Sequence, residues 1–212
     1  MKLNADFSRR VAVHFNDTDW VASPAAGVER KMLDRIGDEV ARATTIVRFA
    51  PGSAFAAHTH GGGEEYLVLD GVFQDESGDF PVGSYVRNPP TSRHTPAAAE
   101  GATILVKLHQ FDPDDRRQVH VNAQTRTEPV VPLFRDGTED VRIETWAPDA
   151  PVKVDADGGC EVFVIEGGFV ESSESFSRWD WLRLPPGSVL GGRAGPEGAR
   201  VWIKTGHLKS MV

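Results

Sequence analysis

The sequence predicts an all-β chain made of two copies of one unit. Its 212 residues include 21 glycines and 14 prolines, and β-branched and aromatic residues fill the short segments between them. This composition is typical of short strands joined by frequent turns, as in a sandwich or a barrel. Two further observations refine the prediction: an internal repeat, and a cluster of histidines confined to one copy.

Several segments of the first half have the composition of strands. Apolar residues in 27–38 also suit a helix, but the flanking glycine would keep that helix short, so we favour a strand there. The other predicted strands of this half are 44–49, 65–69, 84–87 and 103–108.

The internal repeat relates the two halves at an offset of 97 residues. Arg-Phe-Ala-Pro at 48–51 matches Thr-Trp-Ala-Pro at 145–148, and Glu-Gly-Ala at 100–102 matches Glu-Gly-Ala at 197–199. Residues 112–128 are polar and without periodicity, so we expect them to link the copies. The expected domains are therefore residues 1–115 and 116–212.

The histidine cluster lies in the first copy. His58 and His60 are two residues apart and face the same side of an extended segment, because strand side chains alternate. Three glycines then allow a sharp turn, after which Glu64 opens the returning strand. His94 follows thirty residues later. Imidazoles and a carboxylate suit a first-row divalent metal, so a metal site is the leading hypothesis.

The second copy lacks these histidines. At the repeat offset, His58, His60 and Glu64 fall on Asp155, Asp157 and Glu161; after a one-residue slip, His94 falls on Leu190. The sequence Asp155-Ala156-Asp157-Gly158 only partly resembles a calcium loop, and solvated loop carboxylates are the simpler interpretation. We expect this copy to be a scaffold or a partner surface.

Bulk properties exclude several classes of protein. The net charge of −8 and a pI near 5.4 argue against a nucleic-acid surface, which needs clustered Lys and Arg. The single cysteine, Cys160, excludes an internal disulfide and suits a reducing compartment. The N-terminus lacks the apolar core of a signal peptide, and no apolar run reaches membrane-spanning length. We therefore expect a cytoplasmic protein without nucleic-acid or membrane partners.

The spacing of the candidate ligands resembles that of a known superfamily. The first cupin motif is matched by Gly52, His58, His60, Glu64 and Gly71, and the second by Gly83, Pro89 and His94, with Thr91 where glycine is usual. The resemblance implies two tandem cupin barrels, that is, double-stranded β-helices of jelly-roll type. It also implies that His58, His60, Glu64 and His94 bind one divalent metal ion, and it selects Glu64 over Glu65.

Further details narrow the resemblance to the cupin-like domain of ChrR-type anti-sigma factors. They include Asp19-Trp20, the stretch 61–65, Asp75-Glu76-Ser77-Gly78 and Arg87-Asn88-Pro89. In that family the domain binds zinc and senses singlet oxygen or related stress, while a separate N-terminal zinc domain holds the sigma factor. This sequence lacks that domain, so we do not expect direct sigma-factor binding. Cupins commonly form dimers, and the resemblance implies a homodimer.

Three hypotheses for the function follow. The first is a metal-binding ChrR-like bicupin that responds to stress or senses a small-molecule ligand, with zinc as the first choice of metal and iron, manganese or nickel left open. The second is a metal-dependent (Fe) cupin dioxygenase acting on a small diketone. The sequence supplies no clear catalytic residue: Glu65 and His109 are weak candidates for a base, which slightly favours sensing. A vestigial, purely structural bicupin ranks last.

Overall fold

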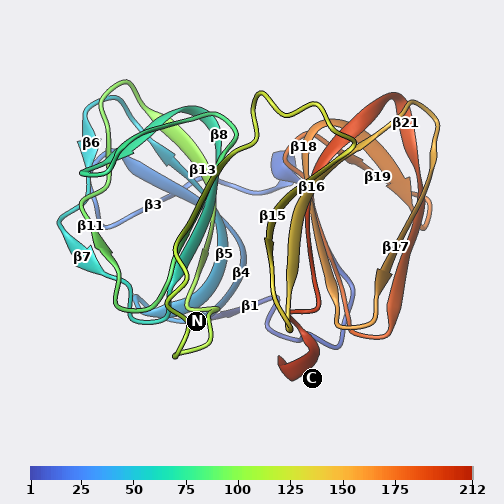
Figure 1. Cartoon of the computed structure of the whole chain (residues 1–212), viewed down its shortest axis with the longest axis horizontal. Coiled ribbons are helices and arrows are strands. Elements are labelled where there is room, and N and C mark those ends of the chain that lie inside the picture. The colour runs from blue at the N-terminus through green and yellow to red at the C-terminus, as the bar shows by residue number, and fades with distance from the viewer. Residues whose placement is uncertain (212) are drawn as a thin grey trace. The chain divides into compact units, whose positions relative to one another are not determined.

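The computed structural model describes residues 1–211, which are almost entirely β-structure (Figure 1). The helical segments among them are two 3₁₀ turns, η1 (Phe15–Asp17) and η2 (Lys209–Met211). The all-β prediction is therefore confirmed. No helix in residues 1–211 has the length and apolarity needed to cross a bilayer.

The chain divides into two compact units. Unit 1 contains Met1–Ala5 and Asp19–Thr125, and unit 2 contains Asp6–Thr18 and the chain from Arg126 onward. This division differs from the expected domains, 1–115 and 116–212, in two places: the boundary between the units lies ten residues later, and residues 6–18 belong to the second unit. Within the expected linker, β14 (Val119–Asn122) pairs with a strand of unit 1, and the N-terminal segment 6–18 belongs to unit 2.

Unit 1 is built on one antiparallel sheet with the strand order β1-β4-β5-β13-β8-β10-β14, and β7 and β11 form a separate ribbon. In Figure 1, β4, β5, β13 and β8 form one layer of this unit, and β6, β7 and β11 lie on the opposite side of its interior. Its strands are β1 (Lys2–Leu3), β3 (Val21–Ala22), β4 (Val28–Gly37), β5 (Ala41–Phe49), β6 (Ser53–Ala54), β7 (His58–Thr59), β8 (Glu64–Asp75), β9 (Gly78–Pro81), β10 (Ser84–Asn88), β11 (Arg93–His94), β12 (Ala97–Ala98), β13 (Ala102–Leu108) and β14 (Val119–Asn122).

The core of unit 1 lies between these layers. Strand register aligns Val47 of β5 with Ile104 of β13, and Ile104 with Val68 of β8, so that one row of apolar side chains faces the interior. The strand expected over 27–38 is confirmed as β4. β4 pairs with β1, β3 and β5, and this pairing outweighs the helical spacing of its apolar residues.

Unit 2 has the strand order β15-β16-β21-β18-β20-β2, with β17 on β21 and β19 on β18. Its apolar core is continuous, and the N-terminal segment supplies the edge strand β2. Its strands are β2 (Val11–Val13), β15 (Val130–Arg135), β16 (Asp140–Trp146), β17 (Pro151–Ala156), β18 (Cys160–Glu171), β19 (Glu174–Ser177), β20 (Trp181–Leu184) and β21 (Ser188–Thr205).

The strand pairing of unit 2 repeats that of unit 1 but corrects the offset. Arg87 pairs with Glu65 in unit 1, and Arg183 pairs with Glu161 in unit 2, so both residues are displaced by 96 positions (183 − 87 and 161 − 65). The offset of 97 holds at the ends of the repeat but not across the candidate ligands. Glu161 is therefore the counterpart of Glu65 and not of Glu64.

Candidate metal centre

Three short segments of unit 1 bring the four predicted ligands together. His58 of β7 and His94 of β11 are direct register partners, and His60 follows β7. Gly63, with φ of +77°, turns the chain so that Glu64 begins β8; a side chain at Gly63 would also collide with the ring of Phe111. The local sequence therefore folds back on itself within seven residues.

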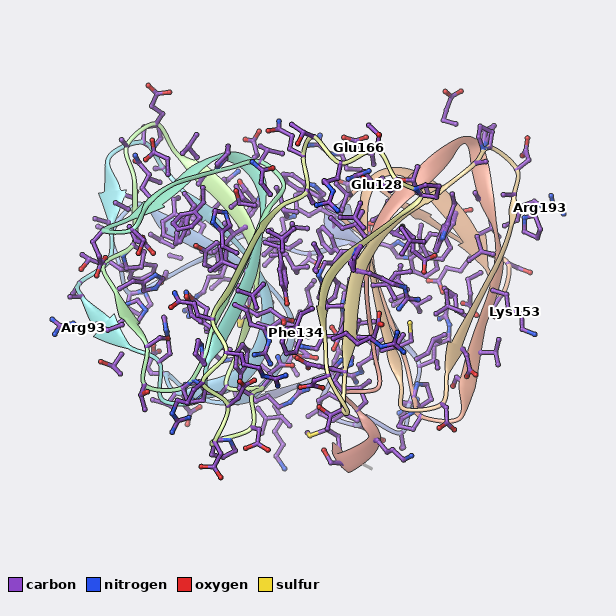
Figure 2. The ribbon with its side chains drawn as sticks, viewed as in Figure 1. Arg93, Glu128, Phe134, Lys153, Glu166 and Arg193 are labelled. Carbon is purple, nitrogen blue, oxygen red and sulfur yellow. The ribbon has the colours of Figure 1, made fainter. Side chains whose placement is uncertain are left out.

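Alternation along β11 directs His94 inward. Arg93 is exposed and points away from the unit in Figure 2, whereas His94 is only 3% exposed. His60 and Glu64 are also buried, and His58 is the least buried of the four. The site thus has one more accessible side, at His58.

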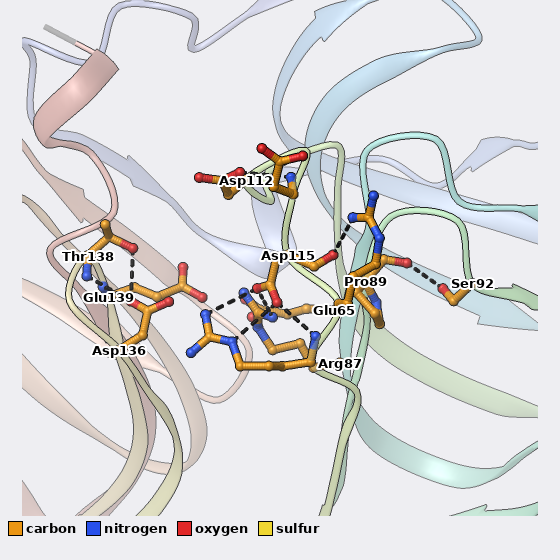
Figure 3. Close-up of polar contacts among 12 residues, drawn as sticks. Glu65, Arg87, Pro89, Ser92, Asp112, Asp115, Asp136, Thr138 and Glu139 are labelled. Carbon is orange, nitrogen blue, oxygen red and sulfur yellow. Dashed lines mark hydrogen bonds and ion pairs between the residues drawn. The ribbon is translucent and has the colours of Figure 1, made fainter.

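Hydrogen bonding fixes which nitrogen of His60 carries the proton. The hydroxyl of Ser92 donates to the carbonyl oxygen of Pro89 at 2.6 Å (Figure 3). The same hydroxyl lies 2.9 Å from Nδ1 of His60, and because its only hydrogen is used, it accepts from Nδ1–H. The Nε2 atom of His60 therefore presents a free lone pair.

The other two imidazoles are held in the same tautomer. Nδ1 of His94 lies 3.2 Å from a carboxylate oxygen of Asp75, and Nδ1 of His58 lies 3.0 Å from the carbonyl oxygen of Ala56. Both oxygens only accept, so each Nδ1 carries the hydrogen and each Nε2 is unprotonated. This arrangement is typical of metal-binding histidines, whose second nitrogen donates to a carboxylate or carbonyl.

The ligand atoms converge at the separations that a metal site requires. Nε2 of His60 lies 3.1 Å from Nε2 of His94, and each lies 3.3 Å from Oε2 of Glu64. One ligand atom from each of the four residues lies within 4.8 Å of the others. Ligands about 2.0 Å from a tetrahedral ion are about 3.3 Å apart. Two lone pairs facing each other at 3.1 Å repel unless a cation lies between them, so the residues fit a divalent ion.

Burial adjusts the protonation of these groups. It lowers the pKa of His60 to about 3, helped by the neighbouring His94, His58 and His109, and it lowers the pKa of His94 despite the opposing effect of Asp75. Burial also raises the pKa of Glu64 to about 7, against a hydrogen bond from the Asn88 amide at 3.4 Å. The imidazoles of His60 and His94 are therefore neutral at neutral pH, as ligation needs.

A cavity of about 460 Å³ opens onto this cluster. His58, His60 and Glu64 line it together with buried apolar side chains of the core. The ring of Phe55 contacts those of His58 and Phe49 edge-on, and Ile104 belongs to the wall. The volume lies within the range of small-molecule sites, which are about 300–1,000 Å³. A small organic molecule thus has room beside the four ligands.

The other residues singled out from the sequence lie elsewhere. Glu65 is buried on the opposite face of β8 and accepts a hydrogen bond from the Tyr85 hydroxyl at 2.9 Å, so it is outside the cluster, as expected. His109 is exposed and contributes to the cavity lining. Cys160 is fully buried, and burial raises the pKa of its thiol to about 12, so it is an apolar packing group.

Sequence reasoning missed the groups that orient the ligands. Asp75 and Ser92 carry no recognisable spacing relative to the histidines, because their contacts depend on the bend of β8 and on the turn before β11. Asn88 stands directly opposite Glu64 in the β8–β10 pairing, and only that register reveals it.

Unit 2 carries an apolar group where unit 1 carries the ligands. At the offset of 96, His58, His60, Glu64 and His94 correspond to Val154, Ala156, Cys160 and Leu190. Val154 and Leu190 are register partners, as His58 and His94 are. All four belong to the buried core of unit 2.

The pairing with Asp155, Asp157 and Glu161 is therefore wrong. Asp155 is exposed on the face of β17 from which Lys153 projects outward in Figure 2, and Asp157, just after β17, is also exposed. Glu161 is buried and contacts Trp181 Nε1 at 3.1 Å and His207 Nε2 at 2.8 Å. The carboxylates are thus not gathered at one site.

Comparison with known proteins identifies relatives of both sequence and fold. The ChrR cupin-like domain family matches residues 8–112, and no curated protein matches the chain by sequence. A putative dioxygenase from Nostoc punctiforme has a TM-score of 0.70 at 14% identity, covering 99% of this chain and 83% of that one. The Escherichia coli pirin YhhW, in complex with nickel(II), has a TM-score of 0.70 at 12% identity, covering 93% and 99%. Escherichia coli Ylba has a TM-score of 0.73 at 14% identity, covering 94% and 92%.

Proposed function

Because residues 8–112 belong to the ChrR cupin-like domain family, we propose that this chain is a metal-binding cupin that responds to stress or senses a small ligand. One observation carries the proposal: three imidazoles hold unprotonated Nε2 atoms toward Glu64 through fixed tautomers. A bound divalent ion would supply a Lewis-acid centre at the end of the cavity. Asp75, Ser92 and Asn88 hold the ligands in place, and the apolar wall excludes water.

Zinc is the first choice for the ion. The three-histidine, one-carboxylate set suits zinc, iron, manganese and nickel alike, so availability decides among them. The nickel in the YhhW structure belongs to that protein and keeps nickel among the alternatives. Metal analysis of protein purified without chelator identifies the ion.

Removing a ligand tests the centre. His58→Ala and His94→Ala should each abolish stoichiometric metal, because three remaining ligands hold the ion far less tightly. Asp155→Ala is the matched control and should retain the full metal content, since Asp155 is exposed in unit 2. Unchanged metal in the histidine variants would contradict the proposal.

A second candidate is a metal-dependent dioxygenase acting on a small diketone. The cavity beside the ligands and the fold shared with the putative dioxygenase from Nostoc punctiforme favour it. Oxygen consumption by the Fe(II)-loaded protein with a panel of small diketones separates the two functions. Uptake that disappears in His94→Ala supports the enzyme; no uptake with any diketone leaves sensing as the function.

The proposal extends to the setting of the protein. We propose a cytoplasmic homodimer, because the single buried cysteine suits a reducing compartment and the sheet of unit 1 ends in edge strands that invite pairing. Light scattering should give twice the chain mass; a monomer at all concentrations would contradict the dimer.

A further inference from the structure

Arg30 is an unexplained charge in the cavity of unit 1. It stands opposite Val47 in the β4–β5 pairing, and Val47 stands opposite Ile104 of β13. Register partners point to the same side of a sheet, and all three residues line the cavity. The guanidinium thus belongs to the same interior face as the apolar wall.

Arg30 has a buried donor without a partner. Its Nε is inaccessible and makes no hydrogen bond within residues 1–211. Glu39 also lines the cavity, but among those residues no ion pair joins it to Arg30. Leaving a charged donor buried and unsatisfied is costly, so such a group in a cavity indicates a missing acceptor.

Among residues 1–211, Arg30 has no acidic partner, whereas its neighbour Arg48 has one. Arg48 lies one position along β5, faces the opposite side and bonds to Glu29 at 2.5 Å. Arg35, on the same strand as Arg30, is a second cation: burial and then the charge of Arg30 lower its pKa. A second positive charge makes a bound anion more favourable still.

The counterpart of Arg30 in unit 2 carries no charge. Val130 pairs with Glu144, and Glu144 pairs with Val201, which repeats the row formed by Arg30, Val47 and Ile104. The arginine thus accompanies the metal-ligand cluster and is absent, with it, from the second unit.

We infer that the cavity of unit 1 binds a small carboxylic acid with an apolar body, whose carboxylate pairs with Arg30 and whose body lies along the wall toward His58 and Glu64. This inference rests on the proposed function, in which a ligand occupies the cavity beside the metal centre. The apolar wall disfavours a bare inorganic anion, because phosphate would lose its hydration against Phe49, Phe55 and Ile104 without compensation.

Calorimetric titration with paired probes tests the inference. The probes are the straight-chain acids from butanoate to octanoate and 3-phenylpropanoate, each compared with its primary amide, with inorganic phosphate as the anion control. At least one acid should bind ten-fold or more tightly than its amide. Arg30→Gln should weaken that acid by about 10- to 100-fold and leave the amide unchanged, because a charge-assisted pair is lost. Arg48→Gln is the matched control and should bind like the wild type.

The thermal midpoint of the ligand-free protein provides a second readout. Arg30→Gln should match or exceed the wild type, since it removes a positive charge next to Arg35 together with a buried Nε that has no partner. A clear loss of stability would indicate that Arg30 serves the fold, and it would overturn the inference.

Metal content, measured on every titrated sample, separates the two proposals. If the metal is stoichiometric but no acid binds, or the acid binds Arg30→Gln as tightly as the wild type, the carboxylate site is wrong and the metal centre stands. Binding of phosphate alone also overturns the carboxylate site. If the wild type holds no metal, the proposed function itself fails, whatever the acids do.

Discussion

The two units share one pattern of strand pairing and differ at the four positions where chemistry is possible. Unit 1 places His58, His60, Glu64 and His94 at positions that unit 2 fills with Val154, Ala156, Cys160 and Leu190. The same backbone therefore supports either converging polar ligands or a closed apolar core. The difference shows that the candidate metal centre is a property of a few side chains placed on the fold, not of the fold itself.

The outer face of the sheet is more alike in the two units. Arg87 and Arg183 are both buried opposite a glutamate, Glu65 or Glu161. Arg87 lies over the ring of Phe111 at 3.9 Å, and Arg183 lies over Phe7 at 4.2 Å. Both units have thus retained a buried arginine opposite a buried glutamate and diverged at the four ligand positions.

The largest effect should come from placing a ligand residue in the closed unit. Leu190→His buries an imidazole among apolar side chains and should reduce the free energy of unfolding of unit 2 by about 4 kcal/mol. Urea unfolding followed by hydrogen exchange of β18 and β21 measures the loss. Val189→His is the control: Val189 is 52% exposed, so its effect should stay within about 0.5 kcal/mol. Equal effects of the two would contradict the assignment of Leu190 to the core.

The next largest effect should come from removing the metal, which should destabilise unit 1 and leave the stability of unit 2 unchanged. A chelator should lower the stability of unit 1 by about 2.7 kcal/mol when the free metal had been 100 times its dissociation constant. Amides of β8 and β13 should then exchange faster, while those of β18 and β21 keep their rates. If the amides of unit 2 alone exchanged faster, the metal would be bound in unit 2, which would contradict the account.

Acid should destabilise unit 1 through Asp115. Although burial opposes it, hydrogen bonds from the Arg117 backbone and the Arg87 guanidinium lower the pKa of Asp115 to about 2 (Figure 3). This carboxylate thus stabilises the folded state fully above its unfolded pKa of 3.8, and the stabilisation is lost as pH falls through about 2.

In unit 2, Arg183 donates instead to the carbonyl oxygen of Asp6, which does not titrate. Asp115→Asn should therefore lower the stability of unit 1 at pH 7 by about 2 kcal/mol and flatten its acid dependence between pH 4 and 2. An unchanged acid profile would contradict the role of Asp115.

The smallest effect concerns the N-terminal segment of unit 2. Asp180 and Glu174 hydrogen-bond to the two nitrogens of His14, at 3.0 and 2.9 Å, and raise its pKa. The stabilisation is complete below pH 6.5 and is lost as pH rises through the raised pKa. His14→Gln should reduce stability below pH 6.5 by less than about 1 kcal/mol, because the contact is partly exposed, and should have less effect above pH 8. Exchange of the β2 amides measures it; a larger effect at high pH would contradict the sign.

The sequence alone predicted the all-β fold and grouped His58, His60 and Glu64, because period-two alternation and a glycine turn are local properties. His94 lies thirty residues further on, and only the resemblance to the cupin motifs added it to the group. It misplaced the ligand positions of unit 2, since adjacent Glu64 and Glu65 offered two matches for the single Glu161, and only strand register decides between them. The membership of residues 6–18 in unit 2 and the tautomers set by Asp75 and Ser92 depend on contacts between distant segments, which composition and spacing do not encode.

The central claim is that one metal ion binds in unit 1 and none binds in unit 2. Anomalous diffraction at the absorption edge of the metal tests it most directly, using crystals of protein purified without chelator. We predict one strong peak per chain, about 2.0–2.2 Å from Nε2 of the three histidines and from a Glu64 carboxylate oxygen. A peak beside Asp155 or Asp157, or none at the histidines, would contradict the account.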